Sequence, residues 1–147
     1  MTNGKKFKIL SVFTGAGGLD IGFHGNFNFL DRHYKELPFE TVTASDINPD
    51  ACETLKADNK YFKNTKVINA DITKFDYTKI KGDFDVLLGG FPCVTFSAAG
   101  KQAGITDNKN GQLYESYAKY AAYFRPKVFL AENVKGMLSA NKGEAVK

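Results

Sequence analysis

The sequence lacks tryptophan and is poor in cysteine, histidine and proline, with two, two and four of these residues among 147. Two cysteines are too few for a disulfide framework, and with only two histidines beside them no spacing typical of a zinc site arises. No stretch approaches the roughly 18 consecutive apolar residues of a membrane span, and the start of the chain lacks the apolar segment of a secretory signal. We therefore expect a cytoplasmic protein with no disulfide, no metal and no membrane partner.

The composition predicts one globular domain, because 43% of the residues are hydrophobic and 24% are charged. The net charge of +4 and the pI near 9.0 permit contact with a polyanion such as nucleic acid. The lysines are spread along the chain and form no single block, so ordinary solubility explains this charge equally well.

Short apolar runs alternate with helical patterns, which predicts an α/β fold with a parallel sheet and crossover connections. Helices are indicated from Leu19, from Pro49 behind the capping residue Asn48, and over 113–124. The strands that the apolar runs predict are 8–14, 41–45, 67–70, 84–88 and 128–131.

Two segments fit neither pattern. Residues 25–38 have mixed polarity and no clean period, so their form stays open. Residues 91–112 hold three glycines among polar residues, which predicts a long, mobile loop. A loop of this length inside a compact domain is usually functional.

Glycines and carboxylates follow the first three predicted strands. Gly15, Gly17 and Gly18 let a ligand approach the backbone at a helix start, although a glycine-rich turn is as often only a tight connection. Asp46 suits the ribose hydroxyls of a nucleoside, and its alternative is a helix-start residue. Asp71 could accept from an adenine amino group or be an ordinary turn aspartate. Together, the three strand ends favour a nucleoside cofactor.

Cys93 and Glu132 follow the next two strands. A free cysteine is usually a small core residue, which suits Cys52 on the apolar side of its helix. Cys93 instead follows the turn 89–92 outside the apolar run, where a thiol can act as a nucleophile. Glu132 ends an apolar strand, where a carboxylate is costly unless it is paired or exposed in a site, and it could supply or hold a proton beside the thiol.

Six motifs occur in order along the chain: VFTGAGGL (12–19), ADI (70–72), GFPC (90–93), FS (96–97), GKQ (100–102) and ENVKG (132–136). Their order and content resemble the motifs of the cytosine-C5 DNA methyltransferases. The resemblance runs from residue 7 to about residue 143 and is weakest over 25–39. It implies a Rossmann-like S-adenosylmethionine-dependent methyltransferase fold, with a parallel sheet and flanking helices, that is incomplete at its C-terminus.

The resemblance also implies a reaction: transfer of a methyl group from S-adenosyl-L-methionine to carbon 5 of a flipped cytosine in double-stranded DNA, within a restriction-modification system. S-adenosyl-L-homocysteine would be the product. Cys93 would add to carbon 6 of the ring and Glu132 would contact the ring nitrogen and exocyclic amine. The cofactor would be bound by Phe13, Gly15, Gly17, Gly18, Leu19, Asp46, Ile47, Asp71, Ile72 and Pro92, and the substrate by Ser97, Asn133 and Val134.

The sequence departs from the family pattern at two positions, since Val94 replaces a usual Gln and Asp46 replaces a usual Glu. No Gln-x-Arg-x-Arg motif or target-recognition region is found in the 147 residues. We therefore expect residues 1–147 to be the N-terminal part of the catalytic domain, from a truncated or split enzyme. A complementary chain could carry the missing motifs, and the piece alone is expected not to methylate DNA.

Three alternatives remain open from the sequence. A related subgroup of the family methylates transfer RNA at the same carbon. A second possibility is a fragment or subunit that binds S-adenosylmethionine without reacting. A nicotinamide-dependent oxidoreductase fits less well, because the glycine spacing is not G-x-G-x-x-G and the motif containing Cys93 would go unused.

Overall fold

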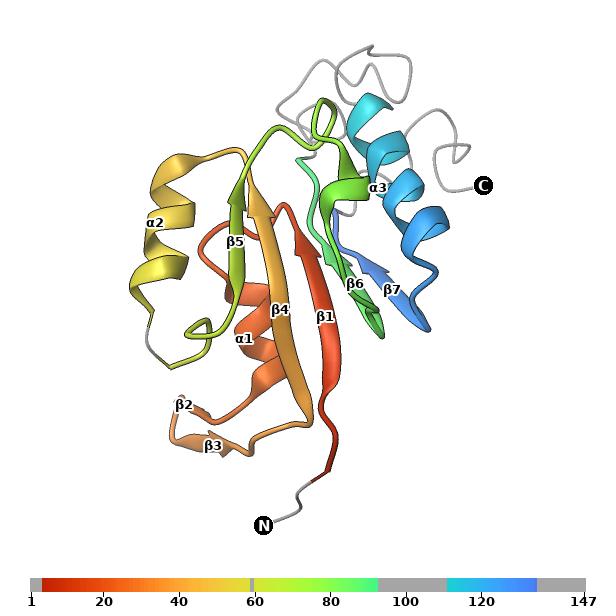
Figure 1. The fold of residues 1–147 in the computed structure, drawn as a ribbon. Helices are drawn as coiled ribbons and strands as arrows, with labels where there is room; N and C mark the ends of the chain where they lie inside the picture. The colour runs from red at the N-terminus through yellow and green to blue at the C-terminus, as the bar shows by residue number, and fades with distance from the viewer. Residues whose placement is uncertain (1–3, 59, 93–110, 135–147) are drawn as a thin grey trace.

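The computed structural model describes residues 4–58, 60–92 and 111–134. In this part of the chain, five strands form one sheet in the order β5-β4-β1-β6-β7, with every neighbouring pair parallel (Figure 1). Parallel neighbours need crossover connections, so the predicted Rossmann-like α/β architecture is confirmed. The strands are β1 (Phe7–Val12), β4 (Phe39–Asp46), β5 (Lys66–Asn69), β6 (Val86–Gly89) and β7 (Val128–Ala131).

The helices of the described residues are α1 (Gly18–His24), α2 (Pro49–Ala57), α3 (Gly111–Phe124) and the 3-10 helix η1 (Tyr77–Lys79). Successive side chains of β1 point to opposite faces of the sheet, so the two faces pack against different helices. Leu10 belongs to a buried cluster that contains Tyr117 of α3. Its neighbour Ile9 packs instead with Leu19 of α1. The sheet is therefore covered on both faces, as its apolar strands require.

A two-stranded hairpin fills most of the segment whose form the sequence left open. Strands β2 (Phe27–Phe29) and β3 (Arg32–Tyr34) pair antiparallel between α1 and β4. The two turn residues, Leu30 and Asp31, both have positive φ, at 44° and 58°. This conformation matches the twist of a two-residue hairpin, but glycine and asparagine normally supply it.

Predicted and observed boundaries agree to within two residues for the five strands of the main sheet. The predicted loop over 91–112 is too long at its far end, because α3 begins at Gly111. Residues 93–110 lie outside the described residues, so the structure does not test the rest of the predicted loop. Within the described ranges, no helix is both long and apolar enough to cross a membrane.

Candidate functional site

The turn between β1 and α1 has a backbone that few side chains tolerate. Phe13, Gly15 and Gly17 have φ angles of 55°, 55° and 86°. A Cβ atom on Gly17 would also collide with the ring of Phe62, so both the angle and the space exclude a side chain there. Phe13 has no such freedom and is held in a strained conformation by its surroundings. The turn therefore allows other groups to approach its backbone closely, and it needs contacts from other elements to hold its conformation.

Asp46 supplies part of that support from the end of β4. One carboxylate oxygen accepts a hydrogen bond from the Gly15 amide at 2.7 Å, and the other accepts from the Asn48 amide at 2.8 Å. Asn48 in turn caps α2, because its side chain accepts from the Asp50 amide at 2.9 Å. The predicted cap is therefore confirmed. Asp46 joins the glycine turn to the start of α2, and its remaining lone pairs can accept further donors.

Asp71 stands at the neighbouring strand end, after β5. Its Oδ1 accepts from the Thr73 amide at 2.9 Å and from the Thr73 hydroxyl at 2.7 Å, and Lys74 lies 3.5 Å from Oδ2. The hydrogen bonds from Thr73, assisted by the charge of Lys74, lower the pKa of the Asp71 carboxyl below its usual range. Asp71 is therefore an ionised acceptor at neutral pH.

A pocket of about 170 Å³ opens between these two strand ends. Ile47 contributes an apolar wall even though 65% of its surface is exposed, which leaves it available for contact with a flat ligand. Apolar walls with two carboxylates can hold a nucleoside by stacking and by hydrogen bonds to its hydroxyl and amino groups. Of the predicted cofactor residues, the pocket brings together Phe13, Asp46, Ile47, Asp71, Ile72 and Pro92.

A second pocket, of about 320 Å³, lies on the other side of Phe13, between the ends of β1 and β6. Its lining includes Leu19, Asp20, Gly90 and Glu132. Phe13 lines both pockets, so the two hollows are neighbours at the carboxyl edge of the sheet. In parallel α/β sheets this edge is where ligands bind.

Glu132 follows β7 and is held close to the turn after β6. Its amide donates to the Gly89 carbonyl at 2.8 Å. A Cβ atom on Gly90 would lie 3.1 Å from a carboxylate oxygen of Glu132, so glycine leaves the space that this side chain occupies. Asn133 adds a second tie, because its amide donates to the Phe91 carbonyl at 3.1 Å. Glu132 is exposed, which is one of the two situations that the sequence analysis gave for a carboxylate at this strand end.

Asp20 is a site residue that the sequence interpretation missed. This carboxylate of α1 is fully buried and accepts from the hydroxyls of Ser11, at 2.9 Å, and Thr41, at 2.7 Å. Burial raises its pKa, although the two hydroxyls oppose the shift. The Thr14 hydroxyl lies 3.1 Å from that of Ser11, which connects Asp20 to the glycine turn. His24 extends the network, since the Thr41 amide donates to its Nε2 at 3.0 Å.

Other predicted site residues stand apart from these pockets or outside the description. Gly15, Gly17 and Gly18 shape the turn but do not line either pocket. Val134 is exposed, with 38% of its surface accessible. Cys93 and Ser97 lie outside the described residues, so the predicted nucleophile has no structural description.

Comparison with known proteins gives one family and several longer relatives. Residues 7–147 match the family model of the C-5 cytosine-specific DNA methylase. The chain is 39% identical to the Type II methyltransferase M.NgoFVII of Neisseria gonorrhoeae, over 99% of this chain and 35% of that protein. It is 36% identical to the Type II methyltransferase M.AquIA of Picosynechococcus, over 95% of this chain and 53% of that protein.

A solved structure with a similar fold is the Dnmt2 methyltransferase of S. pombe. The TM-score is 0.63 at 21% identity, and the match covers 95% of this chain and 40% of that one. This likeness supports the fold alone. The chain spans between about a third and about half of the length of the two curated relatives described.

Proposed function

This chain belongs to the C-5 cytosine-specific DNA methylase family, and we propose that it supplies the cofactor pocket and the catalytic thiol for methylation of cytosine at carbon 5 in double-stranded DNA. Residues 1–147 would then be the N-terminal part of the catalytic domain. The observation that carries the proposal is the place of Glu132 beside Gly90, because Gly90 opens the turn that leads to Cys93.

The cofactor of the proposed reaction is S-adenosylmethionine, and the described residues fit its adenosine part. The pocket at the ends of β4 and β5 combines apolar walls with two carboxylates. Asp46 would accept from the ribose hydroxyls, and Asp71 from the adenine amino group. Ile47 and Ile72 would pack against the base. When bound, the cofactor supplies an electrophilic methyl group on a sulfonium.

The chemistry of cytosine explains why a thiol and a carboxyl are needed together. Carbon 5 is a poor nucleophile until another nucleophile has added to carbon 6. The Cys93 thiolate would form that bond, while Glu132 would hold a proton at the ring nitrogen and neutralise the charge that develops there. Later loss of the carbon-5 proton would restore the double bond and release the sulfur.

The substrate ring must be reached on its face, so the target cytosine has to leave the duplex. The pocket that contains Glu132 would receive it, with Phe13 as the wall shared with the cofactor. Asn133 would support this arrangement indirectly, since its side chain fixes the Phe91 carbonyl beside the catalytic turn.

A chimera tests the proposal. In it, this chain replaces the matching segment of the Neisseria gonorrhoeae relative, so that a protein of full family length is assayed. Tritiated methyl groups should pass from S-adenosylmethionine to cytosine in duplex DNA, and Cys93→Ser should abolish the transfer. The unmodified relative and the Cys93→Ser chimera are the matched controls.

Three results would contradict the proposal. The first is a folded chimera that binds S-adenosylhomocysteine but transfers no methyl group to DNA. The second is a preference for transfer RNA over duplex DNA, which would select the related RNA-modifying reaction. The third is activity that survives Cys93→Ser, which would show that the thiol takes no part in the mechanism.

A further inference from the structure

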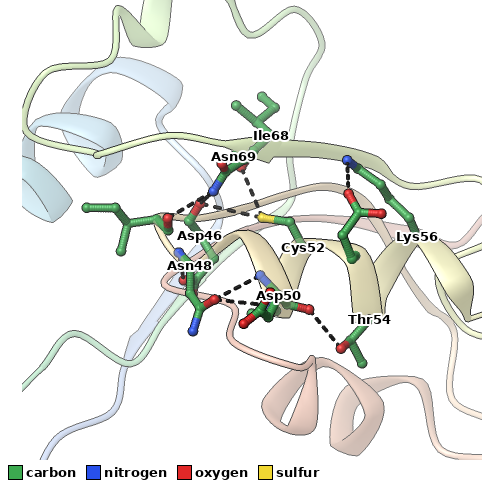
Figure 2. Close-up of polar contacts among 11 residues, drawn as sticks. Asp46, Asn48, Asp50, Cys52, Thr54, Lys56, Ile68 and Asn69 are labelled. Atoms are coloured by element: carbon green, nitrogen blue, oxygen red, sulfur yellow. Dashed lines mark hydrogen bonds and ion pairs between the residues drawn. The ribbon is translucent and has the colours of Figure 1, made fainter.

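Asn69 ends β5 and makes an unusual pair of contacts with the adjacent strand end. In the register of the sheet it stands opposite Asp46. Its side-chain amide donates to the Asp46 carbonyl at 3.0 Å and to the Ile47 carbonyl at 2.9 Å (Figure 2). Both protons of the amide are therefore used on two consecutive residues of the neighbouring turn.

The Asp46 carbonyl is held from three directions. Besides Asn69, the Ala70 amide donates to it at 3.0 Å. The buried Cys52 thiol lies 3.5 Å away (Figure 2). The Ile47 carbonyl, by contrast, has the Asn69 amide as its hydrogen-bond donor among the described residues. Asn69 therefore holds the carbonyl of the Ile47–Asn48 peptide unit, while the Asp46 carboxylate holds its amide.

The two strand ends that Asn69 connects both line the pocket of about 170 Å³ at the ends of β4 and β5. Asp46 and Ile47 line it from β4, and Asp71 lines it from β5, two residues beyond Asn69. Ile47 is mostly exposed, so packing contributes little to its orientation, and its backbone sets where its side chain lies. The width of the pocket therefore depends on the Asn69 contacts.

We propose that Asn69 is a positioning residue that keeps the Asp46–Ile47 turn at the distance from Asp71 that an adenosine ligand needs. The inference rests on the proposed function, because it names a residue that serves the same cofactor site. Asn69 itself does not line the pocket and acts through the residues that do.

The test compares variants that remove one or both of the hydrogen-bond donors of the Asn69 side chain. Asn69→Asp keeps the size of the side chain but offers acceptors where two carbonyls need donors. Asn69→Ser keeps one donor at shorter reach, and it should fall between the wild type and Asn69→Asp. Asn64→Asp is the matched control, because Asn64 is also exposed and its side chain makes no hydrogen bond within 4–58, 60–92 and 111–134.

Two readouts are taken at a temperature where all variants are folded. Calorimetry gives the affinity for S-adenosylhomocysteine, and NMR hydrogen exchange of the Asn48 amide reports opening of the turn. We expect Asn69→Asp to weaken binding by about tenfold, which corresponds to the loss of one or two hydrogen bonds, and to speed exchange by a similar factor. Asn64→Asp should change neither.

The outcomes separate the inference from the proposed function. Failure of the wild-type chain to bind S-adenosylhomocysteine would overturn the proposed cofactor site, and the inference with it. If the wild type binds S-adenosylhomocysteine and Asn69→Asp binds it as tightly as Asn64→Asp does, the inference alone would be overturned. Faster exchange of the Asn48 amide in Asn69→Asp without weaker binding would also overturn the inference. Asn69 would then stabilise the turn without affecting ligand binding.

Discussion

The buried carboxylate of Asp20 gives the most quantitative prediction for this site. Asp20→Ala removes the acceptor for the hydroxyls of two buried residues, Ser11 and Thr41. A buried hydroxyl left without its partner costs about 1 to 3 kcal/mol, and relief of carboxylate burial offsets part of the loss. We expect the free energy of unfolding to fall by about 3 kcal/mol at pH 7, and the thermal midpoint by about 9 °C.

The pH dependence of Asp20 has a definite sign. Burial raises the pKa of its carboxyl in the folded state above the unfolded value. The folded state therefore binds the Asp20 proton more tightly than the unfolded state does. The stability that this proton contributes is fully present below the unfolded-state pKa and is lost as the pH rises through the folded-state pKa. Asp20→Asn cannot titrate. The stability of the wild type relative to Asp20→Asn should decrease as the pH is raised upward from about 4.

Urea unfolding of wild type, Asp20→Ala and Asp20→Asn from about pH 4 to pH 7 measures both the cost of removing the carboxylate and the pH dependence of its contribution. Asp50→Ala is the control, since Asp50 occupies the first turn of α2 as Asp20 occupies that of α1, but is exposed. It should cost less than about 1 kcal/mol, the usual contribution of a carboxylate at a helix N-terminus. An Asp20→Ala loss no larger than the Asp50→Ala loss would contradict the expected cost of the buried carboxylate. A wild-type stability that increases relative to Asp20→Asn as the pH is raised would contradict the sign of the pH dependence.

Three further predictions concern the strand ends. Asp46→Ala removes the acceptor of both the Gly15 and Asn48 amides, so S-adenosylhomocysteine affinity measured by calorimetry should fall at least about tenfold. Asn48→Ala deletes the cap of α2 and should lower the free energy of unfolding in urea by about 1 kcal/mol. Glu132→Gln alters an exposed side chain, so stability should stay within about 0.5 kcal/mol while methyl transfer by the chimera drops at least about 100-fold.

Each of these three has a contrary result. An unchanged affinity of Asp46→Ala for S-adenosylhomocysteine would mean that this carboxylate takes no part in cofactor binding. Unchanged urea unfolding of Asn48→Ala would mean that water replaces the cap without cost. A Glu132→Gln chimera with full activity would exclude the carboxyl as the source or holder of the proton.

The sheet and the grouping of residues at the pocket between β4 and β5 could be predicted because their signals are local. Apolar runs that stop at glycine or aspartate mark the ends of parallel strands, and such ends share one edge of the sheet. Gly17, Asp46 and Asp71 are found at that edge by this reasoning alone. Their hydrogen-bond partners are a different matter, because Asp46 binds an amide 31 residues away.

The supporting residues could not be predicted because their roles depend on distant partners. Asp20 looks like an ordinary first-turn acid, and only folding brings it to hydroxyls 9 and 21 residues away. Asn69 looks like a turn residue, but its partners are 22 and 23 residues earlier. The β2–β3 hairpin has no Asn-Gly or Asp-Gly signal, since Leu30 and Asp31 take its left-handed positions.

The proposed thiol chemistry is tested most directly by trapping. Duplex DNA that contains 5-fluorocytosine has no carbon-5 proton to lose, so a sulfur bonded to carbon 6 stays bonded after methyl transfer. The chimera is incubated with this DNA and S-adenosylmethionine, digested, and the modified peptide is sequenced by mass spectrometry. We expect an adduct on Cys93. An adduct on another residue, or none from a chimera that methylates ordinary DNA, would contradict it.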